Sequence, residues 1–139
     1  MWLLVDVVIM EKRNEILELS FEFALQIIAY CELLEESRKY VISRQLLKSG
    51  TSIGANIREA QNAESKLDFI HKLKIAAKEA EETEYWLSLC DKSASYPTSE
   101  SLLLSIISIK KLLNAIISKT KNSINHTTLN YQKNHQQIS

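Results

Sequence analysis

Turn-forming residues are almost absent from this chain, since its 139 residues include only two glycines and one proline. A β-sandwich or barrel needs a turn roughly every 8–12 residues, and long linkers and collagen-like chains are rich in these same residues. Apolar residues make up 45% of the chain and charged residues 24%, the balance of a soluble globular domain. The sequence therefore predicts one all-α domain.

Apolar residues recur at three- and four-residue steps over four segments, the spacing of one face of an α-helix. The predicted helices span about 15–37, 39–63, 66–92 and, after a cap at 98 or 99, the residues up to 121. Asn14 is the expected cap of the first helix, and Ser65, with Asp68 three residues on, that of the third. Short connections predict an antiparallel up-down-up-down four-helix bundle over residues 14–121.

Both ends are predicted to lie outside this bundle. The apolar run 2–10 is too short to span a bilayer and lacks the features of a signal peptide, and three charged residues follow it. We expect residues 1–13 to be an extension with Met10 as the natural start; the alternative is an extended arm on a neighbouring subunit. Residues 122–139 are mostly polar and are expected to form a disordered tail. Because no targeting signal is evident, we expect a cytoplasmic protein with no membrane partner.

The first and fourth predicted helices carry a second apolar stripe beside their seams. In the first helix this stripe comprises Leu17, Phe21, Ala24, Ile28 and Cys31, and in the fourth it comprises Leu103, Leu104 and Ile107. A monomeric bundle cannot readily bury apolar faces this wide, so oligomerisation is expected.

The second predicted helix contains both glycines of the chain, Gly50 and Gly54. A glycine within a helix costs roughly 1 kcal/mol relative to alanine. We expect a close helix contact at both positions, where any Cβ would clash; the alternative is a kinked or broken helix. Beside the apolar seam runs a small, polar stripe that includes Ser49, Ser52, Asn56 and Glu59.

The net charge is zero, but the charges are unevenly distributed. Residues 101–139 hold five lysines and no acidic residue. One interpretation is a solvated helix face followed by a solubilising tail. The other is an edge that binds RNA or DNA, strengthened in an oligomer. Its candidate contacts are Lys110, Lys111, Lys119 and Lys121.

No residue set points to catalysis, a metal or a cofactor. Cys31 and Cys90 lack further ligands at metal-binding spacing and are predicted to be buried thiols. His71 is expected at the surface. Three carboxylates, Glu59, Glu79 and Glu82, could gather where the second and third helices pack. The alternative is that each pairs with a nearby cation, namely Arg44, Arg58, Lys72 or Lys78.

Two motifs carry a family resemblance. Residues 49–60 read Ser-x-x-Ser-Ile-x-Ala-Asn-Ile-x-Glu-Ala, and residues 78–87 read Lys-Glu-Ala-x-Glu-Thr-x-Tyr-Trp-Leu. Over about residues 19–113 the chain resembles the bacterial four-helix bundle proteins known as 23S rRNA intervening-sequence proteins. The motif residues singled out for packing or function are Ser49, Gly50, Ser52, Gly54, Asn56, Glu59, Glu79, Glu82, Tyr85 and Trp86.

The resemblance implies a homopentamer of antiparallel bundles with no established enzymatic activity. A similar family, the accessory proteins of diversity-generating retroelements, forms basic pentamers that bind nucleic acid and a reverse transcriptase, whereas this chain is neutral overall. The expected function is therefore a non-enzymatic oligomeric scaffold or adaptor. The alternatives are a nucleic-acid-binding accessory protein and an enzyme with a carboxylate site between subunits.

Overall fold

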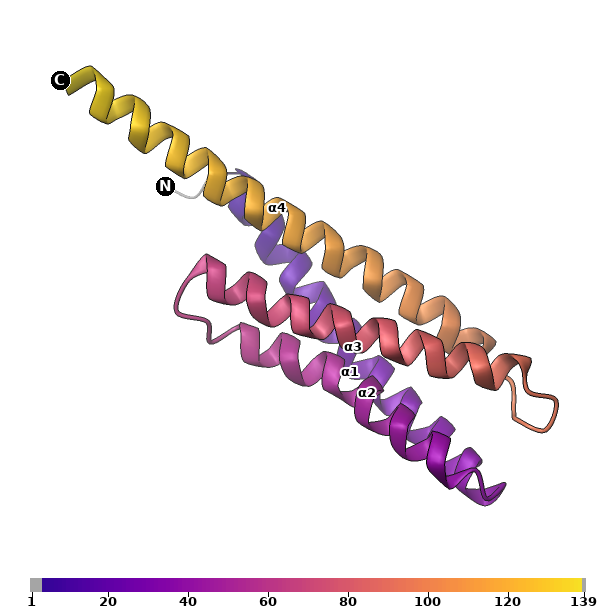
Figure 1. Cartoon of the computed structure of the whole chain (residues 1–139). Coiled ribbons are helices and arrows are strands. Elements are labelled where there is room, and N and C mark those ends of the chain that lie inside the picture. Colours follow the sequence, from indigo (N-terminus) through magenta and orange to yellow (C-terminus); the bar gives the residue numbers. More distant parts are fainter. Residues whose placement is uncertain (1–3, 139) are drawn as a thin grey trace.

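The computed structural model describes residues 4–138, which form four helices. These are α1 (Leu4–Glu36), α2 (Tyr40–Ala60), α3 (Lys66–Lys92) and α4 (Glu100–Ile138), and they run antiparallel in chain order (Figure 1). No strand occurs within residues 4–138. The predicted all-α four-helix bundle is confirmed.

The helices are arranged as a square in chain order. The pairs α1–α2, α2–α3, α3–α4 and α1–α4 are in contact, whereas the diagonal pairs are not, within the described helices. By length and composition alone α4 could cross a membrane, but one stripe of it, with Ile106, Ile109 and Leu113, is buried in the bundle core. The largest fully buried side chains are Ile16, Phe23, Ile27, Leu34, Leu46, Ile53, Ile57, Leu73, Leu87, Ile106, Ile109 and Leu113.

Each turn has a local cause. Arg38, with a φ of 62°, reverses the chain after α1. Ser65 caps α3 as predicted, because its hydroxyl accepts a hydrogen bond from the Asp68 amide at 3.0 Å. The turn before α4 contains Pro97, whose carbonyl accepts a hydrogen bond from the Tyr30 hydroxyl at 2.8 Å. This bond ties the α3–α4 turn to α1.

The two glycines of α2 differ in their surroundings. A Cβ on Gly50 would lie 2.9 Å from two carbon atoms of Ile27, so the predicted close contact is confirmed there. At Gly54 the nearest atoms belong to Ser20 and lie 3.4 Å from a Cβ, an ordinary contact distance, so the clash predicted at this position is wrong. The alternative of a broken helix also fails, because α2 is continuous over Tyr40–Ala60.

The N-terminal boundary differs from the prediction. Residues 4–13 belong to α1 rather than to an extension outside the fold, and residues 1–3 lie outside the described residues. Ile9 is buried, and Asp6 lies 3.8 Å from the Lys66 ammonium at the start of α3. The charged residues 11–13 do not divide the apolar run from the first helix. They continue the helix, because glutamate, lysine and arginine are good helix formers.

The C-terminal boundary differs as well. Residues 122–138 continue α4 as a helix rather than forming a disordered tail, and Ser139 lies outside the described residues. Ser123 is buried and Ile124 half-buried, whereas residues 125–137 are all exposed. The chain has no glycine or proline after Pro97, so neither of the two strong helix breakers interrupts this segment. In Figure 1 the yellow end of α4 therefore projects beyond the turn between α2 and α3.

Candidate functional site

The first candidate site is an apolar face on α1 beside α2. Phe21, Leu25 and Ile28 are 59%, 48% and 42% exposed, and Leu17 and Ala24 are half-buried beside them. A groove of about 160 Å³ runs between these residues and the outer side of α2. Its α2 wall consists of Thr51, Gly54, Ala55 and Arg58. The predicted second stripe of α1 is therefore a solvent-facing surface, except at Cys31, which is buried.

A second apolar face lies on α3 and α4. The ammonium of Lys110 pairs with the carboxylates of Glu81 and Glu84, which fixes the antiparallel register of the two helices. Counting along both helices from these ion pairs, we expect Ile107 to lie near the level of Tyr85 and Leu104 near that of Leu89. All four side chains are exposed: Leu104, Tyr85, Ile107 and Leu89. We call the two surfaces the α1–α2 face and the α3–α4 face.

The polar motif residues of α2 form hydrogen bonds mainly within their own helix. The hydroxyl of Ser52 donates to the Lys48 carbonyl at 2.6 Å, and the Asn56 amide donates to the Ser52 carbonyl at 2.8 Å. Ser49 is buried, and its hydroxyl lies 3.0 Å from that of Thr83 on α3. These bonds satisfy polar groups where α2 and α3 pack, which is a structural role.

The three candidate carboxylates do not form one cluster. Glu59 pairs with Lys72 at 2.9 Å, as the charge-pairing alternative predicted. Burial raises the pKa of Glu79, and the neighbouring charge of Glu82 raises it further, whereas Lys48 lowers it. Within residues 4–138 no group of three or more His, Cys, Asp or Glu side chains could hold a metal ion.

The aromatic motif residues lie next to Glu82. The indole nitrogen of Trp86 donates a hydrogen bond to a Glu82 carboxylate oxygen at 3.3 Å. The rings of Tyr85 and Trp86 meet edge to face with centroids 5.3 Å apart. Trp86 is half-buried and Tyr85 is exposed, so this pair forms part of the surface of α3.

The four candidate lysines of α4 do not share one face. Lys110 is engaged by Glu81 and Glu84, and hydrogen bonds to these carboxylates raise its pKa. Lys119 is half-buried and Lys121 exposed, and two residues apart on a helix they point about 200° away from each other. Lys121 instead lines a groove of about 300 Å³ between α3 and α4, together with Lys74 and His71. His71 is exposed, as predicted.

Both cysteines are buried free thiols, as predicted. Burial raises the pKa of Cys31 to about 11, and it also raises that of Cys90. The Ser43 hydroxyl donates to the Cys31 carbonyl at 3.2 Å, which joins α2 to α1 at this point. Both thiols therefore pack in the core as small apolar groups.

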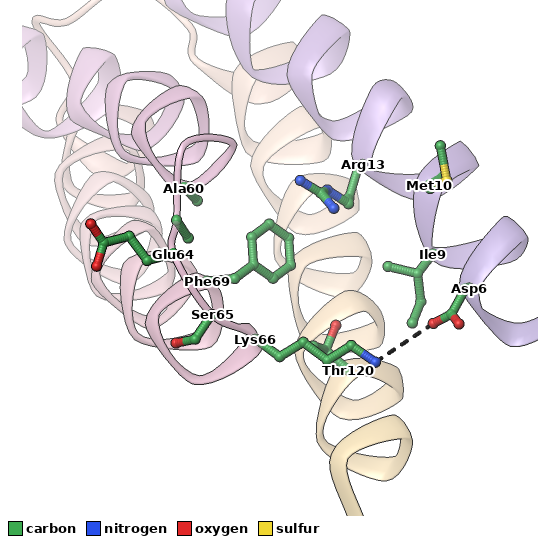
Figure 2. Close-up of a pocket in the computed structure, with 11 residues that line it drawn as sticks. Asp6, Ile9, Met10, Arg13, Ala60, Glu64, Ser65, Lys66, Phe69 and Thr120 are labelled. Carbon is green, nitrogen blue, oxygen red and sulfur yellow. Dashed lines mark ion pairs between the residues drawn. The ribbon is translucent and has the colours of Figure 1, made fainter. Parts of the chain in front are cut away.

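A cavity that sequence reasoning missed lies where α1, the α2–α3 turn and α4 meet (Figure 2). Its volume is about 250 Å³, and Ile9, Arg13 and Phe69 are among its lining residues. The first two belong to residues 1–13, which were predicted to lie outside the fold. The apolar run before residue 11, which only Asp6 interrupts, was the signal that could have placed these residues in the bundle.

Comparison with known proteins identifies the relatives of this bundle. A family described as 23S rRNA-intervening sequence protein matches residues 12–115. The chain is 47% identical to a solved protein of unknown function from the S23 ribosomal protein family of Bacteroides thetaiotaomicron VPI-5482. The TM-score is 0.73, and the match covers 77% of this chain and 98% of that one. No curated protein matches the chain. Because the family match spans most of the bundle, the chain belongs to the 23S rRNA-intervening sequence protein family.

Proposed function

We propose that this protein is a non-enzymatic homo-oligomer, a pentamer, which acts as a scaffold or adaptor for other molecules. The observation that carries the proposal is the pair of exposed apolar faces on one small bundle. Phe21 on the α1–α2 face and Leu104 on the α3–α4 face are 59% and 64% exposed. Clustered exposed apolar side chains mark interaction surfaces in soluble proteins.

The positions of the two faces favour a ring over a two-fold dimer. Because the helices form a square in chain order, the α1–α2 face and the α3–α4 face lie on opposite sides of the bundle. A two-fold dimer pairs one patch with the same patch of its partner, whereas contact between two different patches continues head to tail, as a closed ring where the rotation between subunits closes and as an open filament where it does not. Five subunits accord with the pentamer implied by the family resemblance.

The chemistry of the motif residues supports a binding role rather than catalysis. Ser52 and Asn56 donate to carbonyls of their own helix, and Glu59 is neutralised by Lys72. A catalytic carboxylate needs a pocket and a partner that tunes its pKa for proton transfer. Glu79 has a raised pKa, but it does not line any of the cavities described above.

Light scattering coupled to size-exclusion chromatography tests the oligomer. The expected mass is that of five chains. Phe21→Glu places a charge in the α1–α2 face and should yield monomers. Leu129→Glu changes a side chain of similar exposure on the projecting end of α4 and should leave the pentamer intact. A monomeric or dimeric wild-type protein would refute the ring.

A second candidate function is nucleic-acid binding, which the groove with Lys74, Lys121 and His71 favours because no acidic residue lines it. The test is RNA binding at low and moderate salt. Lys74→Gln with Lys121→Gln should weaken binding, whereas Lys110→Gln should not, since Lys110 is already paired. Binding to phosphates falls steeply with salt. No binding at low salt would reject this candidate.

A further inference from the structure

We propose that the cavity beside Arg13 is a binding site for a small organic carboxylate with a compact apolar body. The site goes beyond the scaffold function and does not depend on it. It lies at the end of the bundle where the start of α1 covers the α2–α3 turn, and Figure 2 shows Arg13 and Phe69 directed towards its interior.

The first argument is that the charge of Arg13 has no counter-ion among the residues that the structure describes. Its Nε and one Nη nitrogen donate to the same amide oxygen of Gln61, at 3.1 and 2.9 Å. Gln61 is neutral, and no carboxylate oxygen lies within 4.0 Å of Arg13 among residues 4–138. The side chain is half-buried, and this burial lowers its pKa. A desolvated cation without an anion is costly, and a bound carboxylate would remove that cost.

The second argument is that Arg13 is already held in a binding geometry. Its guanidinium lies 4.4 Å from the centroid of the Phe69 ring, and Gln61, which orients it, is itself fixed by a 2.9 Å bond from its amide to the Ile57 carbonyl. The other Nη nitrogen makes no hydrogen bond within residues 4–138. The free end of the guanidinium can therefore donate hydrogen bonds to both oxygens of one carboxylate, the geometry that arginine prefers.

The other charges around the cavity are accounted for. Lys66 lies 3.8 Å from Asp6 and donates to the Ser123 hydroxyl at 2.7 Å. Glu64 is exposed, and Figure 2 shows its carboxylate directed away from Arg13. Of the two cations that line this cavity, Arg13 is therefore the one that can pair with a ligand.

The third argument is the size and polarity of the walls. Ile9, Ala60 and Phe69 are buried, and Met10 contributes a further apolar side chain. The volume of about 250 Å³ lies just below the usual range of ligand pockets, which begins at about 300 Å³, and is too small for a nucleotide or a helical peptide. An aromatic or branched monocarboxylate can pair with the Arg13 cation and place its apolar body against these walls.

Part of the site lies outside the segment that the family match covers. Asp6, Ile9 and Met10 precede residue 12, where the family match begins. These residues form the wall contributed by α1, which is helical here from Leu4 onward.

The experiment uses benzoate as the probe on the full-length protein. Isothermal titration measures its affinity, and the ¹⁵N–¹H signal of the Arg13 Nε reports contact with the guanidinium. Benzoate should bind saturably and shift this signal. Arg13→Gln should weaken binding at least about tenfold, because it removes a charge-assisted pair. Arg44→Gln is the matched control, since Arg44 is an exposed arginine on α2.

Two further ligands separate the proposal from simpler explanations. Benzyl alcohol binding as tightly as benzoate would overturn it, because the cavity would then be selecting apolar bodies only. Acetate or inorganic phosphate binding as tightly as benzoate would also overturn it, because the apolar walls would contribute nothing. If Arg13→Gln unfolds, Arg13→Lys replaces it, because lysine keeps the positive charge but lacks the paired N–H donors of the guanidinium. Unchanged benzoate affinity in Arg13→Lys would refute bidentate recognition.

Discussion

At the scale of single residues, the contact between Gly50 and Ile27 fixes how closely α1 and α2 approach. Ile27 is fully buried, so its side chain has little room to move away from an added methyl group. Gly54, four residues later on the same helix, faces Ser20 at ordinary contact distance. The two glycines can therefore be compared directly, because packing excludes a Cβ at Gly50 but not at Gly54.

We predict opposite effects of alanine at these positions. Gly50→Ala should lower the free energy of unfolding by about 1–2 kcal/mol, because overpacking outweighs the gain in helix propensity. Gly54→Ala should leave it unchanged or raise it by up to about 1 kcal/mol. Urea denaturation at one protein concentration measures both. Equal losses in the two variants would contradict the contact geometry.

Glu79 gives a pH-dependent prediction. Its pKa is raised by burial and by Glu82, so the folded state binds this proton more tightly than the unfolded state does. Stability contributed by this group is therefore present below its unfolded pKa and is lost as the pH rises through its folded pKa. Glu79→Gln should stabilise the protein at pH 7 by up to about 0.5 kcal/mol, since solvent screens this partly exposed charge.

Thermal denaturation at pH 7 and at pH 3.5 tests this prediction. The gain from Glu79→Gln should disappear at the lower pH, where the wild-type carboxyl is protonated. Glu18→Gln on the exposed surface of α1 serves as the control. If the gain in stability were the same at both pH values, the ionisation of Glu79 would not be its cause.

At the scale of the elements, α4 combines two kinds of helix. Up to Thr120 and Ser123 it has buried residues in every turn, whereas residues 125–137 contact solvent on all sides. A helix without tertiary packing is marginal in water. Amides of residues 126–138 should therefore exchange with deuterium far faster than those of residues 102–120, as hydrogen-exchange mass spectrometry can measure. Equal protection along α4 would mean that another surface covers its end.

The helices that were predicted best are those with clear sequence boundaries. Ser65 and Pro97 bracket α3, which was predicted with its observed bounds, Lys66–Lys92. The ends of α1 and α4 were predicted too short, because charge at residues 11–13 and polarity after 121 were interpreted as the end of structure. Charged and polar side chains alone did not mark a boundary here, because glutamate, lysine, arginine and glutamine are good helix formers.

The candidate sites were predictable only where they depend on periodicity. The α1–α2 face follows from the second apolar stripe, because Phe21 and Ile28 cannot reach the core along with Phe23 and Ile27. The cavity beside Arg13 could not be predicted, since it requires the α2–α3 turn, α4 and the first turns of α1 to meet. Contacts between residues distant in sequence depend on packing that one segment does not reveal.

At the scale of the whole molecule, the two apolar faces predict that folding and assembly are coupled. A protein stabilised by association melts at a temperature that rises with its concentration. The wild-type protein should show this rise in differential scanning fluorimetry, and Ile28→Glu, on the α1–α2 face, should abolish it. A midpoint independent of concentration over a hundredfold range would argue against an obligate oligomer.

The square arrangement of the helices also has a kinetic consequence. Three of its four helix contacts join consecutive helices, so each can form as a local hairpin. Only the α1–α4 contact brings together segments separated by two whole helices, and it therefore carries the largest entropy of loop closure. Mutations between α1 and α4, such as at Ile109, should therefore accelerate unfolding and leave the refolding rate almost unchanged. We therefore expect the contact between the first and last helices to form last during folding and to open first during unfolding.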